Sequence, residues 1–197
     1  GASVAAFGGE EPLNGSSSYD WSVATTGPEC GRSAAGTGSF VTGAAFHANA
    51  SFVWTKTRKN AFSFFRGVVP GAADAFRATL YASGLGDDFV LCAYKIFLDG
   101  ALLGCGPGRG EAPLHARGTN ATYEAVAYDS YDVTEVVKRG QPVAVAIEGV
   151  ASKATKPQRR GVLLQVDVED SRGTVSTYFT DETWLAYDAD AYLRPTM

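Results

Sequence analysis

The stretch that decides the fold is Tyr128-Asp129-Ser130-Tyr131-Asp132-Val133-Thr134. A short segment that ends at a glycine follows it and leads into the apolar run 142–150. Asp132 is placed to accept hydrogen bonds at the start of a helical turn, and Lys138 and Arg139 suit the end of that turn, which attracts cations. This order of a Tyr-Asp-Val-Thr segment, one helical turn, a glycine and a strand predicts a connection within a β-sandwich.

The sequence around this stretch alternates short strand patterns with turns. Runs of aromatic and β-branched residues are bounded by glycine, proline and serine, as expected for strands. The sequence therefore predicts an all-β fold, an antiparallel two-sheet β-sandwich with one short helix. We expect residues 39–197 to form the sandwich and residues 1–38, rich in Gly, Ser and Ala, to form an irregular N-terminal arm anchored by Trp21. The clearest strand patterns are 61–69, 75–82, 89–98, 143–150 and 162–169.

Composition narrows the function classes. The chain has 197 residues, of which 45% are hydrophobic and 19% charged, which suits one globular domain. Its net charge of −4 argues against a nucleic-acid partner, which usually needs a basic face. No apolar run reaches the roughly 18 residues that span a bilayer, so no membrane partner is expected.

The cysteines predict free thiols. There are 3 of them, so at least one lies outside any disulfide within the chain. Cys92 and Cys105 lie on a predicted hairpin that turns at Asp99-Gly100, a pair typical of type I′ turns. In that register Cys105 faces Tyr94 and Cys92 is a diagonal neighbour, about 7–8 Å away. That separation favours two buried thiols over a disulfide.

Short motifs occur in a fixed order along residues 50–187, and together they are specific. They are Phe65-Arg66, 78–86 (ATLYASGLG), Leu98-Asp99-Gly100, 128–134 (YDSYDVT), 163–166 (LLQV) and 180–184 (TDETW). This series resembles the N-terminal galactose-binding-like β-sandwich of bacterial-type α-L-rhamnosidases, which are glycoside hydrolases. The resemblance implies a jelly-roll sandwich.

The resemblance also implies that the chain is a fragment of a glycosidase whose hydrolysis belongs to a separate helical barrel. No catalytic constellation is visible in this chain, because His47 and His115 stand in no nucleophile or metal motif. Two roles stay open. The first is a non-catalytic accessory domain that binds carbohydrate near the catalytic domain. The second is a purely structural domain that packs on the catalytic barrel and does not bind sugar by itself.

The candidate carbohydrate-binding residues are aromatic and polar side chains expected on loops beside the Tyr-Asp-Val-Thr segment. They are Tyr94, Tyr123, Tyr128, Asp99 and Arg109. In relatives that bind sugar through calcium the turn at Asp99 supplies ligands, so Asp99 is also the candidate metal residue. Calcium takes six to eight oxygens and Asp99 offers one carboxylate, so no cofactor is expected.

Three of the 4 asparagines, Asn14, Asn49 and Asn120, lie in Asn-x-Ser/Thr sequons. This enrichment predicts a glycoprotein of the secretory pathway, secreted or lysosome-like, with the modified residues on surface loops. The alternative is coincidence in a chain rich in serine and threonine.

Overall fold

The chain forms two units, Gly1–Phe46 and His47–Met197. The computed structural model describes residues 13–24, 35–55, 62–85, 92–106, 128–151 and 161–189.

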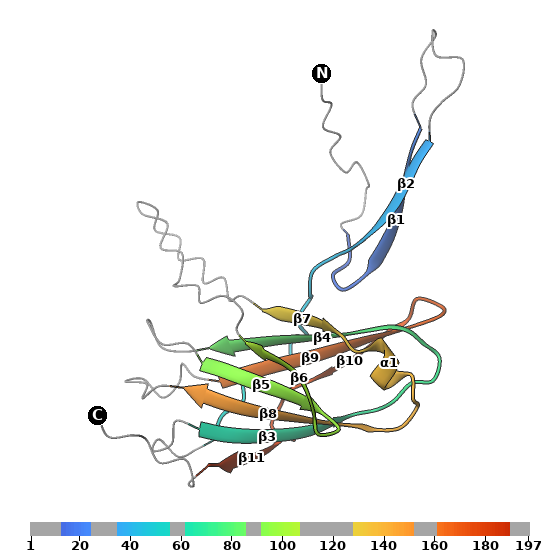
Figure 1. Cartoon of the computed structure of the whole chain (residues 1–197). Helices are drawn as coiled ribbons and strands as arrows, with labels where there is room; N and C mark the ends of the chain where they lie inside the picture. Colours follow the sequence, from blue (N-terminus) through green and yellow to red (C-terminus); the bar gives the residue numbers. More distant parts are fainter. Residues whose placement is uncertain are drawn as a thin grey trace, which may run out of the picture. The chain divides into compact units, whose positions relative to one another are not determined.

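The larger unit holds two antiparallel sheets packed as a sandwich (Figure 1), which confirms the predicted all-β fold. The five-stranded sheet has the order β11-β3-β8-β5-β6, and the four-stranded sheet has the order β10-β9-β4-β7. One short helix, α1, follows β7. The elements are β3 (Phe62–Val69), β4 (Ala75–Leu85), β5 (Cys92–Leu98), β6 (Ala101–Gly106), β7 (Asp129–Asp132), α1 (Thr134–Val137), β8 (Val143–Ala151), β9 (Gly161–Asp170), β10 (Val175–Phe179) and β11 (Leu185–Asp188).

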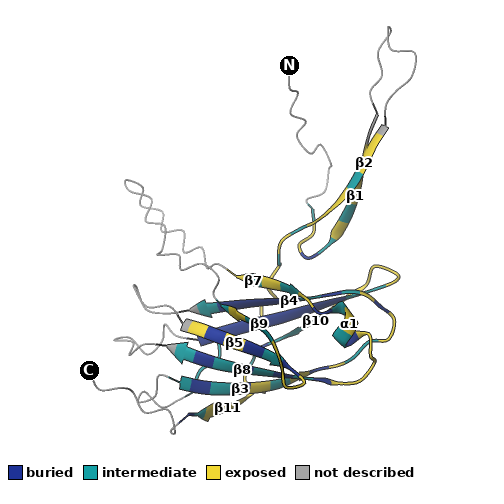
Figure 2. Ribbon diagram, viewed as in Figure 1, coloured by how far each residue is buried: buried dark blue, intermediate teal, exposed yellow. Residues whose placement is uncertain are grey.

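Alternation along the strands builds the core between the sheets. On β8, the side chains of Val143, Val145 and Ile147 are buried, and the residues between them face outward. Leu80 of β4 and Val166 of β9 meet them from the other sheet. This period of two is expected where one face of an antiparallel strand is covered. Figure 2 shows buried positions along β4, β9 and β5.

The Tyr-Asp-Val-Thr stretch forms β7 and the start of α1. The Asp132 carboxylate accepts hydrogen bonds from the Thr134 amide, at 2.9 Å, and hydroxyl, at 2.6 Å. It therefore holds the first helical residue, although the N-cap residue itself is Val133. The Tyr131 ring packs against Gly104, where any Cβ atom would collide with it. Among the described residues, no helix has the length and apolar character needed to cross a membrane.

The β5–β6 hairpin corrects one predicted register. Asp99 and Gly100 have φ angles of 48° and 84°, as a type I′ turn requires. A bulge adds one residue to β6, so Cys105 lies opposite Lys95 and not opposite Tyr94. The predicted register is therefore wrong, and the Cys105 thiol is exposed rather than buried.

The smaller unit contains a β-hairpin. In it, β1 (Ser18–Ala24) pairs with β2 (Ala35–Val41) in antiparallel register. This regular structure lies largely within residues 1–38, for which the sequence predicts an irregular arm. Its strands contain several Ser and Gly residues, which carry little β propensity, so the pattern is weak.

Candidate functional site

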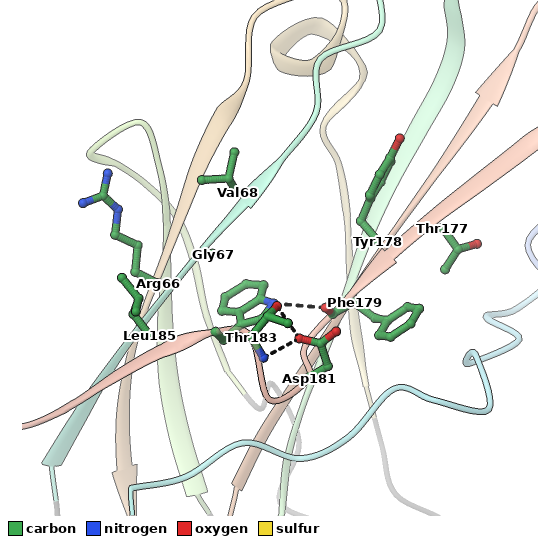
Figure 3. A pocket seen from close by; sticks show the side chains of 10 residues that line it. Arg66, Gly67, Val68, Thr177, Tyr178, Phe179, Asp181, Thr183 and Leu185 are labelled. Carbon is green, nitrogen blue, oxygen red and sulfur yellow. Dashed lines mark hydrogen bonds between the residues drawn. The ribbon is translucent and has the colours of Figure 1, made fainter.

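A groove opens at the edge of the sandwich where β10 leads into β11 (Figure 3). We call it the edge groove; it encloses about 640 Å³, a size typical of ligand sites. Its walls come from the middle of β3, from the end of β10 and from the segment that joins β10 to β11. The lining residues are 66–68, 177–179, Asp181 and 183–185.

The floor of the edge groove is the indole of Trp184, and a glycine on β3 makes room for it. Gly67 stands at an inward-facing position, where a Cβ atom would lie 2.5 Å from Trp184 Cε2. The indole occupies this space and packs against the core. Its Nε1 donates a hydrogen bond to the Phe179 carbonyl at 3.0 Å, which fixes the ring between the two sheets.

A tight turn carries the chain from one sheet to the other and positions Trp184. The Asp181 carboxylate accepts hydrogen bonds from the Thr183 hydroxyl, at 2.6 Å, and amide, at 2.8 Å. The bond from the hydroxyl, followed by the bond from the amide, lowers the pKa of Asp181 below its ordinary value. Asp181 is therefore a stable anion beside the indole at neutral pH.

The rim of the edge groove combines a cation with apolar side chains. Arg66 is exposed, and none of the described residues forms an ion pair with it. Leu185, directly opposite Arg66 on β11, is 70% exposed, and Val68 is 58% exposed. The arrangement offers an aromatic surface, hydrogen-bond donors from Arg66 and acceptors from Asp181 to a small polar ligand.

The predicted tyrosines lie elsewhere in the sandwich. Tyr94 is only 2% exposed, and its hydroxyl donates to Asp129 Oδ2 at 2.6 Å and lies 3.0 Å from the Ala82 carbonyl oxygen. The structure therefore places this ring in the core rather than on a loop. Tyr128 is 39% exposed and meets Tyr81 edge-on, with ring centroids 5.7 Å apart.

Asp99 is held by the backbone of β8. Its Oδ1 accepts a hydrogen bond from the Ala144 amide at 2.9 Å, and Arg139 lies 3.9 Å from its Oδ2. One carboxylate with an oxygen already engaged and a cation beside it does not fit a calcium ion. Among the described residues, no group of three or more His, Cys, Asp or Glu could hold a metal. Asp99 is also five residues along β5 from Tyr94, about 17 Å, so the structure does not bring the two together.

The remaining predicted residues divide into two sets. Arg109, Tyr123 and Asn120 lie outside the described residues. Asn14 and Asn49 are exposed, as carriers of a glycan must be.

Sequence reasoning missed the edge groove because its residues come from segments more than a hundred positions apart. The available signal was Gly67, a glycine inside a strand, which often marks a place where another group approaches closely.

Comparison with known proteins shows which solved structures share this fold. No protein-family model matches the sequence, and no curated protein matches it. The α-L-rhamnosidase structure from Dictyoglumus thermophilum aligns with a TM-score of 0.61 and 18% identity, over 89% of this chain and 21% of that one. The GH78 family rhamnosidase of Bacillus sp. GL1 aligns with a TM-score of 0.52 and 22% identity, over 73% and 14% of the two chains. Native α-L-rhamnosidase from Aspergillus terreus aligns with a TM-score of 0.54 and 17% identity, over 91% of this chain and 22% of that one.

These matches define the class first: the chain is an antiparallel β-sandwich of the kind found as one domain of larger enzymes. More particularly, it has the fold of a domain of α-L-rhamnosidases, which confirms the resemblance seen in the sequence. The chain spans between 14% and 22% of the length of these three enzymes.

Proposed function

We propose that the sandwich is a non-catalytic accessory domain of an α-L-rhamnosidase-like glycoside hydrolase and that it binds carbohydrate in the edge groove, near the catalytic domain. The observation that carries this proposal is that one hollow is lined by an indole, a guanidinium and a carboxylate, those of Trp184, Arg66 and Asp181. The shared fold and the small part of each enzyme that the chain spans support the accessory role.

The chemistry of the edge groove suits a sugar. A pyranose has a flat side made of C–H groups and a rim of hydroxyls. An aromatic surface can bury the first, and charge-assisted hydrogen bonds can satisfy the second. Arg66 supplies donors in a rigid fork, and Asp181 keeps the oxygen that Thr183 does not use. A mostly apolar hollow with a few placed polar groups is the usual composition of a ligand site.

Calorimetric titration with L-rhamnose and related glycans, with and without calcium, tests the proposal. We expect saturable binding at millimolar or tighter concentration that does not depend on calcium. Arg66→Ala should weaken it at least about tenfold, because a charged hydrogen bond contributes roughly 1.5–3 kcal/mol. Arg172→Ala, on the exposed turn between β9 and β10, is the matched control and should bind like the wild type. Absence of any heat at high sugar concentration would sink the proposal.

A second candidate is a structural domain that packs on the catalytic barrel. One observation favours it: the outward-facing side of the five-stranded sheet is unusually apolar. Leu102, Val68, Leu185 and Tyr187 on this side are 58–70% exposed. Antiparallel sheets that face water on one side normally carry polar residues there, and contiguous apolar patches mark interaction sites.

Limited proteolysis of a longer protein that contains the catalytic barrel tests this candidate. Tyr187→Glu should loosen the docked sandwich and raise its rate of cleavage severalfold. Val175→Glu, a 39% exposed position on the outward side of the other sheet, is the matched control. Equal cleavage rates for the two variants would contradict a docking role for this face.

We further propose that the protein is a glycoprotein of the secretory pathway. Asn14 and Asn49 support this because both asparagine side chains are exposed. Expression in a secreting eukaryotic cell, followed by enzymatic removal of N-glycans, should lower the apparent mass. Loss of that mass change in an Asn14→Gln, Asn49→Gln, Asn120→Gln variant is the control, and no change in the wild type would refute the proposal.

A further inference from the structure

The hairpin of the smaller unit has two chemically different faces. Antiparallel pairing places Tyr19 opposite Phe40 and Trp21 opposite Gly38, so these side chains share one face. The other face carries small polar residues. They are Asp20, Ser22, Thr37 and Ser39.

Trp21 lies across the neighbouring strand because that strand has glycine beneath the ring. A Cβ atom at Gly38 would lie 2.6 Å from Trp21 Cζ2 and 2.9 Å from Nε1, and one at Gly36 would lie 3.8 Å from Cζ3. One side of the indole is therefore seated on the backbone of β2. The side chain is still 46% exposed, which leaves the opposite side of the ring available.

A pair of rings borders this platform along the strands. Tyr19 and Phe40 stack across the hairpin, with centroids 5.5 Å apart and planes inclined by 20°. The Tyr19 hydroxyl accepts a hydrogen bond from the Asn14 amide at 2.6 Å, so the ring is held in place and its own O–H is directed elsewhere. A flat indole beside a fixed aromatic pair and a hydroxyl is a preformed surface.

The size of this surface identifies its ligand. A fully exposed aromatic side chain contributes about 150–250 Å². Trp21 and Phe40 are 46% and 41% exposed and Tyr19 less, so the exposed parts of the three rings amount to roughly 200–250 Å². A standard protein interface needs about 800 Å² from each partner, which this face does not supply. It is, however, large enough for one sugar ring, whose partly positive C–H groups are attracted to the negative face of an indole.

We propose that Trp21, with Tyr19 and Phe40, forms a second carbohydrate-binding site that stacks on the flat side of a pyranose. The site is distinct from the edge groove and shares no residue with it. The inference rests on the proposed function, since it assumes that the chain meets glycans.

Saturation-transfer NMR with the methyl glycosides of L-rhamnose, D-galactose and D-glucose tests the inference on the full chain. An Arg66→Ala background weakens binding in the edge groove, so the contribution of the hairpin is easier to resolve. In that background we expect residual transfer to at least one glycoside, a drop of at least about fivefold on Trp21→Ala, and partial retention on Trp21→Phe. Ser39→Ala, on the polar face of the hairpin, should leave the transfer unchanged. Bound glycoside should also shield Trp21 from acrylamide quenching.

Gly38→Val keeps every ring but removes the seat of the indole, so it should weaken the transfer about as much as Trp21→Ala. Because this variant could disturb the hairpin itself, Trp21→Phe serves as the variant that keeps the fold.

The outcomes separate the two proposals. If the wild type binds and the Arg66→Ala, Trp21→Ala variant keeps the transfer seen with Arg66→Ala alone, the hairpin site is refuted while the groove survives. If the wild type receives no transfer from any glycoside, both proposals fail. A change in sedimentation mass on Trp21→Ala would identify the face as a protein contact and overturn the inference.

Discussion

The outward sides of the two sheets differ sharply in chemistry. On the four-stranded sheet, the outward side of β9 and β4 includes polar side chains that pair with one another. Gln165 donates to Asp167 at 2.9 Å, and Arg77 forms an ion pair with Glu169 at 2.9 Å. His47, from the segment before β3, donates its amide to Gln165 Oε1 at 2.7 Å. These polar groups therefore find their partners within the chain.

On the five-stranded sheet, charged groups are few. The described outward positions carry one ion pair, between Lys95 and Glu148 at 3.2 Å, and the unpaired Arg66 at the edge groove. Their neighbours on this side are alanine, valine, leucine and aromatic residues. They include Phe64, Val68, Ala144, Ala146, Val150, Phe97, Leu102, Leu185 and Tyr187.

The difference indicates which side of the sandwich pairs its polar groups within the chain and which side suits a protein neighbour. A solvated sheet face gains nothing from leucine and tyrosine, whereas a docked face gains roughly 25 cal/mol for each Å² that it buries. If the apolar side is covered by a neighbouring domain, the edge groove lies at its margin. A glycan held there would be close to that neighbour, as the proposed function requires.

The largest effect should come from exchanging an inward residue of β8, compared with the outward residue beside it. Ile147→Ala should lower the free energy of unfolding by about 2–5 kcal/mol, because Ile147 is 1% exposed in the core. Ala146→Ser should change it by less than about 0.5 kcal/mol. Urea unfolding measures both, and comparable losses would mean that the assigned inner and outer sides of β8 are wrong.

The next largest effect on the free energy of unfolding is expected on the outward side of the four-stranded sheet. Gln165→Ala should cost about 1–3 kcal/mol, because it leaves the His47 amide and a buried Asp167 oxygen without their partner. Gln165 is fully buried, so water cannot replace it readily. The control is Ser176→Ala on the adjacent strand. A cost near zero for Gln165→Ala would show that this side is not held together by its polar pairs.

A substitution on the outward side of the five-stranded sheet should change the surface properties of the chain more than its free energy of unfolding. Tyr187→Glu in the isolated chain should shift the free energy of unfolding by at most about 0.5 kcal/mol, because the side chain is 66% exposed. It should reduce the binding of a hydrophobic dye and the tendency to self-associate. Val175→Glu on the opposite sheet should alter dye binding less, and equal reductions would erase the contrast between the two faces.

A pH dependence is expected at the turn where Asp132 meets Thr134. Hydrogen bonds from the hydroxyl and then the amide of Thr134 lower the pKa of Asp132 from its ordinary value of 3.8. A carboxyl whose pKa is depressed by folding stabilises the native state above its unfolded pKa, and that contribution disappears as pH falls through the folded value. Asp132→Ala should therefore cost about 0.5–1 kcal/mol at pH 7, discounted by solvent screening, and progressively less below pH 3.8. If the difference in free energy of unfolding between the wild type and Asp132→Ala did not shrink as pH falls, the proposed role of the Asp132 carboxylate would be contradicted.

Much of the fold could be predicted because it depends on local patterns. Alternation located β3, β4, β8 and β9, and the Asp99-Gly100 pair located a hairpin turn. The bulge in β6 could not be predicted, because nothing in its local sequence reveals that one residue is looped out. Cys105 was consequently assigned to the wrong partner and the wrong environment.

The candidate site was harder to predict than the fold. Tyr94 belongs to the core because its hydroxyl meets Asp129, a contact set by the pairing of β7 with β4 rather than by any neighbouring residue. The edge groove depends on Gly67 and Trp184, which meet only when β11 closes one edge of the sheet. Pairings of this kind between distant segments leave little trace in a single sequence.

The most direct test of the central claim is a titration of the ¹⁵N-labelled chain with L-rhamnose, followed by amide chemical shifts. The proposed function predicts saturable shifts grouped at Gly67, Thr177, Phe179 and Thr183, which line the edge groove, and their loss in Arg66→Ala. Shifts grouped instead at the Asp99-Gly100 turn, or no shifts at saturating sugar, would contradict it.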